Sequence, residues 1–172
     1  MDKIRQAIPL IDPSFLNTPQ FISKGLSDHF DCQLTVKIET LNPIRSFKGR
    51  GAEMFISQAA PDEPIVCASA GNFGQAMAYA CQKKKIPLTV FASKNANTYK
   101  IEMMRSFGAT VILMGEDFDE AKIIAKAHAK KLQLRFVEDS QDIETLAGAG
   151  TIGLELLNLP YTLDALLISL GN

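Results

Sequence analysis

Lys48 is the residue whose position in this sequence most directly suggests chemistry. It lies in the segment Asn42–Ala52 (NPIRSFKGRGA), which follows a strand-like alternating run and opens a helical stretch. The amino end of a helix disfavours a cation, and partial burial there also favours the neutral amine. A neutral, oriented lysine amine can condense with an aldehyde. Taken alone, the local pattern is more typical of a solvated surface lysine, so both interpretations stay open at this point.

A second segment suggests an anion site. Ser69–Gln75 (SAGNFGQ) lies between a short apolar run that ends at Ala68 and a helical stretch that continues to Lys85. Small residues here leave main-chain N–H groups free at the amino end of a helix, an arrangement that suits a phosphate or a carboxylate. Asn72 can cap this helix or bind a ligand. The same pattern also fits an ordinary tight turn from strand to helix.

The elements around these segments predict an α/β fold with an open, twisted, mainly parallel sheet and flanking helices. Short apolar runs alternate with longer amphipathic stretches, a pattern typical of right-handed βαβ units and a doubly wound sheet. Strands are predicted at 34–39, 65–68, 88–92, 110–114, 134–137 and 163–170, and helices at about 46–58, 72–85, 98–107, 117–132 and 151–157.

Composition excludes several classes of function. The 172 residues carry 18 basic and 19 acidic side chains, so no excess of charge points to nucleic acid or to an anionic membrane surface. Cys32, Cys67 and Cys81 are widely spaced, which argues against disulfides and against a thiolate metal site. His29 and His128 are interpreted as surface or structural residues. With no signal-peptide pattern and no apolar run of membrane-spanning length, we expect a soluble, cytoplasmic protein without a metal.

The carboxyl-terminal residues predict a truncated chain. Residues 165–170 have the pattern of a buried parallel strand, and Gly171-Asn172 begins a turn at which the sequence stops. An apolar strand without a partner invites aggregation, so a natural domain rarely ends with one. We therefore expect a fragment or a truncated product.

Together the two segments resemble the fold type II pyridoxal-phosphate (PLP) enzymes, which include threonine and serine dehydratases, serine racemase, threonine synthase and cysteine synthase. Ser46–Ala52 is similar to the Schiff-base lysine motif of this family, and Ser69–Gln75 is similar to its substrate-carboxylate loop about twenty residues further on. Three more segments resemble family elements in the same order: Asn17-Thr18-Pro19, Lys100 with Phe107–Val111, and Ala147–Ile152.

This resemblance implies PLP as the cofactor and a role for each residue of the two segments. Lys48 would carry the cofactor and act as the general base, while the cofactor ring accepts electron density. Phe47 would pack near the ring, and Gly171 would begin the loop that binds the phosphate. The substrate, a hydroxy amino acid of the L-threonine or L-serine class, would be bound by Ser69, Ala70, Gly71, Asn72 and Phe73, with Asn72 also contacting the cofactor.

Departures from the family pattern bear on the reaction. Ala70 stands where serine racemases have a serine, which favours β-elimination to a 2-oxo acid and ammonia over racemisation. Asn42-Pro43 slightly favours the replacement enzymes, threonine synthase and cysteine synthase, which stay open as alternatives. Phe73 stands where dehydratases usually have histidine, and Arg45 where they usually have glycine.

The resemblance also implies a division of the chain. Residues 63–147 would form a small α/β domain, and 1–62 and 148–172 would belong to a large domain that is cut short, with the site between the two. Such a chain holds half a cofactor site, so we expect little turnover from it alone and a homo-oligomer for the full-length parent. The alternative of another class is a non-catalytic α/β binding module.

One glycine motif has two interpretations. Gly148–Gly153 matches the dinucleotide pattern Gly-x-Gly-x-x-Gly, but a polar stretch precedes it instead of a buried strand. We therefore expect close packing and an unusual turn before the next helix.

Overall fold

A parallel four-stranded sheet forms the core of residues 63–147. The computed structural model describes residues 1–168. The strand order is β5–β4–β3–β6. The elements are β3 Ile65–Ala68, α4 Asn72–Lys84, β4 Leu88–Ala92, α5 Thr98–Ser106, β5 Thr110–Leu113, α6 Phe118–Leu132 and β6 Arg135–Val137. Each strand returns to the sheet through a helix, which confirms the predicted α/β fold.

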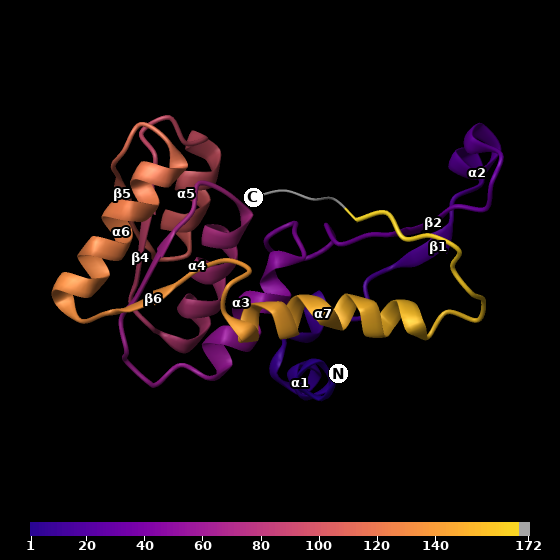
Figure 1. Ribbon diagram of the computed structural model, residues 1–172, viewed down its shortest axis with the longest axis horizontal. Coiled ribbons are helices and arrows are strands. Elements are labelled where there is room, and N and C mark those ends of the chain that lie inside the picture. Colours follow the sequence, from indigo (N-terminus) through magenta and orange to yellow (C-terminus); the bar gives the residue numbers. More distant parts are fainter. Residues whose placement is uncertain (169–172) are drawn as a thin grey trace.

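Alternating side chains of the strands fill two separate layers. In β3, Val66 and Ala68 face α6, where they pack with Ala125 and Ala129. Cys67 faces the other side and joins the larger core that α4 covers. Figure 1 shows α6 on one side of the sheet and α4 on the other. Because both faces are covered, β3 is buried at all its residues, as is usual for a parallel strand.

The chain reverses direction across the sheet at β3. From β3 it steps outward to β4 and β5, and then α6 carries it back over the sheet to β6, on the other side of β3. This order makes the gap beyond the carboxyl ends of β3 and β6 the topological switch point of the sheet. Open α/β sheets bind ligands at such a point.

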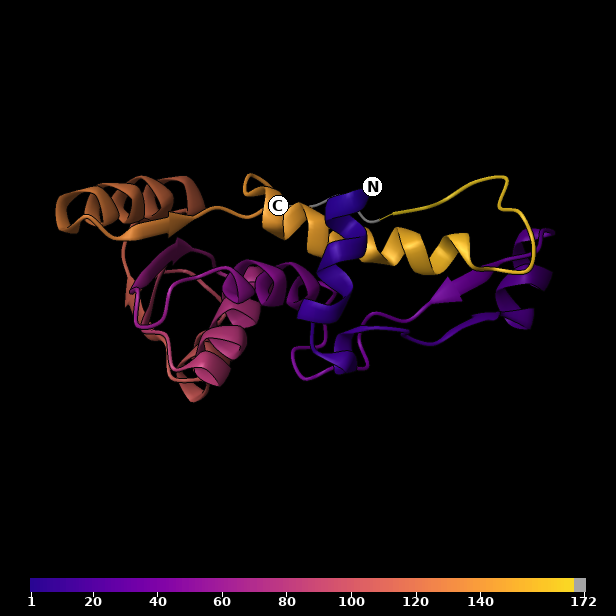
Figure 2. The ribbon, with the colours of Figure 1, turned by 90° about the horizontal axis from the view of Figure 1, so that it is seen from below.

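A second group of elements lies beside the sheet. Helix α7 runs along the long axis of the molecule and packs on α3 and α1 (Figures 1 and 2). The antiparallel pair β1–β2 lies near its carboxyl end. The bounds are α1 Asp2–Ala7, η1 Ile8–Leu10, η2 Pro13–Phe15, β1 Gln20–Ile22, α2 Lys24–Phe30, β2 Thr35–Lys37, α3 Lys48–Ser57 and α7 Ile143–Leu157.

Glycines allow α3 and α7 to touch at the main chain. A Cβ atom on Gly148 would lie 2.3 Å from the carbonyl oxygen of Arg50, and one on Gly51 would lie 2.7 Å from that of Thr145. The close packing expected of the glycine motif is thus present. The turn expected there is wrong, because Gly148–Gly153 lies inside α7, which begins at Ile143. Burial against α3 overrides the low helix propensity of glycine.

The strand predicted at 163–170 is also wrong within the described residues. Residues 162–168 form no strand and are exposed, and 169–172, including Gly171, lie outside the described part of the chain. A strand needs a neighbour for its main-chain hydrogen bonds, and no strand within residues 1–168 pairs with this segment. The segment follows Tyr161, whose hydroxyl lies 2.9 Å from that of Thr35 in β2.

Among residues 1–168, no helix combines the length and apolar character that crossing a membrane requires.

The helix crossing can be tested with two alanine substitutions on α7. Gly148→Ala is expected to lower the free energy of unfolding by about 1–3 kcal/mol, because its Cβ would collide with the main chain of α3. Gly153→Ala places a Cβ in open space on the same helix, so it should be neutral or stabilise by up to about 1 kcal/mol. Urea unfolding measures both, and equal losses would contradict the close crossing.

Candidate active site

Two loops leave the sheet together at the switch point. Ser69 follows β3 and Asp139 lies two residues after β6. The two strands are parallel neighbours, and Cys67 pairs with Val137 at their carboxyl ends. Ser69 and Asp139 therefore emerge side by side at the edge of the sheet where a ligand is expected.

Lys48 reaches this edge from outside the sheet. It is the first residue of α3, and its Nζ donates a hydrogen bond to Oδ2 of Asp139 at 2.7 Å. The amine also lies 5.0 Å from the centre of the Phe47 ring. The Lys48 side chain is 20% exposed, so it is not the solvated surface lysine that the local pattern alone favoured.

The loop before Lys48 is fixed by its own hydrogen bonds. The side-chain oxygen of Asn42 accepts from the main-chain N–H groups of Ile44 and Ser46, and its NH₂ donates to the carbonyl of Glu39 at 2.8 Å. The hydroxyl of Ser46 in turn accepts from the N–H of Lys48. These bonds hold the start of α3, and with it the base of the Lys48 side chain, in one place.

Arg45 in this loop adopts a left-handed conformation, with φ of +54°. A residue with a Cβ atom is strained there, whereas glycine is not. This conformation explains why glycine suits the position in the dehydratase pattern.

Ser69 organises the turn that begins α4. Its hydroxyl accepts from the main-chain N–H groups of Gly74 at 2.9 Å and Gly71 at 3.2 Å. Asn72 is exposed, and its Oδ1 accepts from Nζ of Lys100 at 2.6 Å. Lys100 also bonds Oε1 of Gln75, so an ammonium group is fixed at the amino end of α4. The dipole of α4 and this charge both favour an anion at the turn.

The turn also leaves room for a ligand. A Cβ atom on Gly71 would have no neighbour within 4 Å, and Ala70 next to it is only partly buried. Phe73 differs from the others, because its side chain is 5% exposed and packs into the core. The structure therefore brings Lys48, Ser69, Gly71 and Asn72 to one edge and points Phe73 away from it.

These residues fit PLP as far as the described chain extends. A shielded amine, which an aldehyde requires, lies beside an open turn of small residues that suits an anionic ligand. Gly171, expected to begin the phosphate loop, lies outside the described residues.

Sequence reasoning missed a buried ion network behind the site. Arg50 is fully buried, and its guanidinium bonds both carboxylates of Glu39 and Glu155, with N–O distances between 2.6 and 3.2 Å. Thr151 and Thr18 accept from the same group. The signal was in the sequence: Thr18, Arg50 and Thr151 lie in three of the segments that carry the family resemblance, and here these segments meet.

The network lowers the pKa of one of its carboxyl groups. Burial by itself would raise the pKa of Glu155, but hydrogen bonds from Arg50 and Lys37 hold it below the ordinary value. Hydrogen bonds to Glu155 and Glu39 raise the pKa of Arg50 against the effect of its burial. The guanidinium thus has a carboxylate partner on either side.

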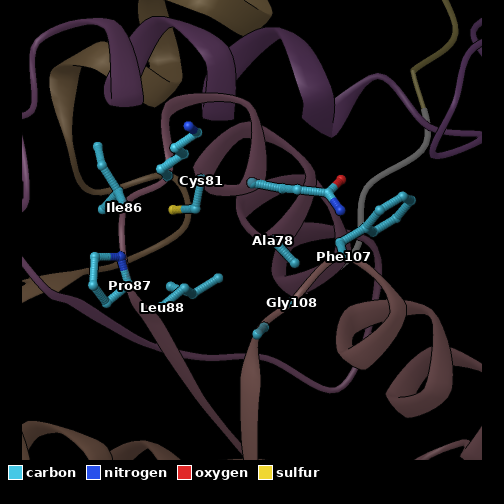
Figure 3. Close-up of a pocket in the computed structure, with 10 residues that line it drawn as sticks. Ala78, Cys81, Ile86, Pro87, Leu88, Phe107 and Gly108 are labelled. Atoms are coloured by element: carbon cyan, nitrogen blue, oxygen red, sulfur yellow. The ribbon is translucent and has the colours of Figure 1, made fainter.

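A separate hollow lies at the opposite end of the sheet. A cavity of about 260 Å³ is bordered by the end of α4 and by residues just before β4 and β5, including Cys81, Pro87 and Gly108 (Figure 3). It lies at the amino ends of the strands, opposite the switch point. Burial raises the pKa of the Cys81 thiol to about 12, so this cysteine is not a nucleophile.

Several known proteins are similar to this chain in sequence and in structure. Residues 11–172 match the family of pyridoxal-phosphate dependent enzymes. The chain is 34% identical over 163 residues to the biosynthetic L-threonine dehydratase of Halalkalibacterium halodurans, covering 91% of this chain and 39% of the relative. The structure of threonine deaminase isoform 2 from Solanum lycopersicum gives a TM-score of 0.79 at 29% identity, and the match covers 90% of this chain and 45% of the deaminase. The structure of maize serine racemase gives a TM-score of 0.83 at 26% sequence identity, and the match covers 91% of this chain and 48% of the racemase.

The doubly wound sheet with a lysine at its switch point defines a type of site that suits an aldehyde cofactor. The chain belongs to the pyridoxal-phosphate dependent enzyme family, as the sequence resemblance predicted. It spans 39% of the length of the bacterial dehydratase it matches.

The strain at Arg45 can be measured directly. Arg45→Gly is expected to raise the free energy of unfolding by about 0.5–1 kcal/mol, because glycine adopts positive φ without steric cost. Arg45→Ala removes the same side chain but keeps a Cβ atom, so it should give no such gain. Urea unfolding distinguishes them, and equal effects would mean that the side chain, not the main chain, is responsible.

The buried network predicts a particular pH dependence. Because the pKa of Glu155 is lowered in the folded chain, its contribution to stability is present above its ordinary value of 4.5 and is lost as the pH falls through the folded value. Glu155→Gln should therefore cost about 3–5 kcal/mol near neutral pH, because it leaves the buried cations Arg50 and Lys37 with only one carboxylate, that of Glu39, between them. The difference from wild type should shrink as the pH falls below 4.5 and through the folded pKa of Glu155.

Glu102→Gln provides the control, since it removes an exposed carboxylate on α5 that pairs with Arg105. Its cost should be below about 1 kcal/mol. A difference between wild type and Glu155→Gln that stays constant with pH would contradict the assignment.

Proposed function

We propose that the chain is part of a PLP-dependent lyase that eliminates the β-hydroxyl of a hydroxy amino acid, with L-threonine or L-serine as substrate and a 2-oxo acid and ammonia as products. The observation that carries the proposal is the Lys48 amine, shielded and fixed at the switch point beside the Ser69–Asn72 turn. The relatives named threonine dehydratase and threonine deaminase support the same reaction.

Each residue of the site has a role in this proposal. Bound PLP supplies an electron sink for the charge that develops at the substrate Cα. Lys48 carries the cofactor, and its amine, once free, takes the Cα proton as general base. Phe47 packs beside the cofactor, and Gly171 begins the loop that binds its phosphate.

The turn before α4 binds the substrate. The free N–H groups at the start of α4 and the fixed Lys100 ammonium attract the substrate carboxylate. Ser69 keeps the turn in shape through its bonds to Gly71 and Gly74. Asn72 contacts the cofactor after exchanging its bond with Lys100 for one with the ligand.

Ala70 favours elimination over racemisation. Its methyl group carries no proton that could be delivered to the opposite face of the substrate, whereas a serine hydroxyl could do so. The similarity to maize serine racemase shows that the two reactions share this fold. Replacement of the leaving group, as in threonine synthase or cysteine synthase, remains the alternative within the family.

We also propose the division into domains that the resemblance implies. Residues 63–147 hold the parallel sheet as the small domain, and 1–62 with 148–172 contribute to the large one. The packing of α7 on α3 and α1 supports grouping the two ends of the chain. We further propose that the complete protein is cytoplasmic and forms homo-oligomers.

Borohydride trapping tests the role of Lys48. The purified chain is mixed with PLP, reduced, and mapped by peptide mass spectrometry. The expected result is a pyridoxyl adduct at Lys48 that is lost in Lys48→Arg, while labelling elsewhere is unchanged. Labelling spread over exposed lysines such as Lys24 and Lys83, or none at all, would instead favour a non-catalytic α/β binding module.

A further inference from the structure

The Lys48 amine has a partner that no motif in the sequence indicates. Asp139 lies 91 residues further along the chain, in the polar stretch before α7, and its Oδ2 is 2.7 Å from Nζ of Lys48. The carboxylate is 31% exposed and the lysine 20%. The pair thus lies at the rim of the switch point, partly shielded from water, at the atom on which the proposed function depends.

Asp139 is held by the turn that carries it. The N–H of Glu138 donates to Oδ2 of Asp142 at 2.9 Å, and the carbonyl of Glu138 accepts from the N–H of Gln141 at 3.2 Å. The carboxylate of Glu138 pairs with Lys122 and Lys126 of α6. The turn is therefore anchored to β6, α6 and α7 at once.

Lys48 is equally constrained from its own side, by the Asn42 loop and by the Arg50 network in the first turn of α3. A salt bridge between two flexible surface side chains costs entropy to form and contributes little. Here both main-chain segments are fixed, so the two side chains meet with little further ordering. The fixed main chain on both sides therefore holds the amine and the carboxylate in contact.

We propose that Asp139 is a further catalytic residue of this centre, which holds the Lys48 amine at the switch point and takes up the proton that Lys48 must lose before it attacks an aldehyde. The inference rests on the proposed function of Lys48. It identifies the group that prepares this lysine to receive the cofactor.

The proton and electron pairs balance without any other reactant. Lys48 passes one proton to Asp139, and its nitrogen lone pair then forms a bond to the aldehyde carbon while the π pair of the carbonyl moves to oxygen. This oxygen receives one proton from the nitrogen and one from Asp139, and it leaves as water. A carbon–nitrogen double bond forms, and Asp139 ends as a carboxylate again.

Two reagents test the two parts of this role on the purified chain. Acetic anhydride reacts with an uncharged amine and requires no proton donor. Asp139→Asn should therefore raise the labelling of Lys48, relative to the exposed Lys131, by about threefold to fivefold, because the carboxylate no longer holds the ammonium. The same variant should slow borohydride-trapped adduct formation with PLP at Lys48 by at least about tenfold, because the proton donor for the departing water is gone.

Two control variants accompany Asp139→Asn. Asp139→Glu keeps a carboxylate and should restore most of the rate with PLP. Glu102→Gln removes an exposed carboxylate on α5 that pairs with Arg105, away from this turn, so it should leave the labelling of Lys48 unchanged. Far-UV circular dichroism confirms that each variant is folded at the temperature of labelling.

Two results would overturn the inference. Unchanged anhydride labelling of Lys48 in Asp139→Asn would show that the carboxylate does not hold the amine. A rise in both reactions would show that it holds the amine but transfers no proton. In either case a PLP adduct at Lys48 in the wild-type chain would leave the proposed function standing. Absence of this adduct would refute the proposed function. The anhydride result would then still show whether Asp139 holds the Lys48 amine.

Discussion

Burial of the Arg50 guanidinium is the constraint on which the rest of the structure depends. A charged group without water costs several kcal/mol unless it is paired, so the chain must bring Glu39, two residues after β2, and Glu155 of α7 to it. This requirement fixes α3 against α7. Lys48 begins α3 two residues before Arg50, and Asp139 lies just before α7. Satisfying one buried charge therefore places the amine and the carboxylate opposite each other.

The sheet contributes the other half of the site. Reversal of the chain at β3 leaves a gap beyond the carboxyl ends of β3 and β6, and the small residues after β3 keep this gap open. The amine is thus supplied by one group of elements and the turn before α4 by the other. Neither group alone brings Lys48 and Ser69 to the same edge of the sheet.

Sequence predicted the parts of the fold that local patterns control. The strands β3 to β6 follow short apolar runs and the helices α4 to α6 follow amphipathic stretches, and their predicted ends agree with the structure to about one residue. The start of α7 was missed because its glycines have low helix propensity, and only contact with α3 makes them favourable. The contacts of Lys48 with Asp139 and of Arg50 with Glu155 were missed because these residues lie 91 and 105 residues apart, beyond any local pattern. The strand predicted at 163–170 relied on apolar character alone.

The separation between Arg50 and Glu155 has a consequence for how the protein is made. The strands β3, β4 and β5 pair with the strand next in sequence, so they can form as soon as they leave the ribosome. Helix α3 is synthesised earlier, but its charged partner on α7 emerges only 105 residues later. Until then the Arg50 charge must stay in water and the first turn of α3 has no fixed position. Lys48 is translated early, but we expect it to be among the last residues to reach its position beside Asp139. Until then the nascent chain does not present the Lys48 amine, held in that position, to aldehydes in the cell.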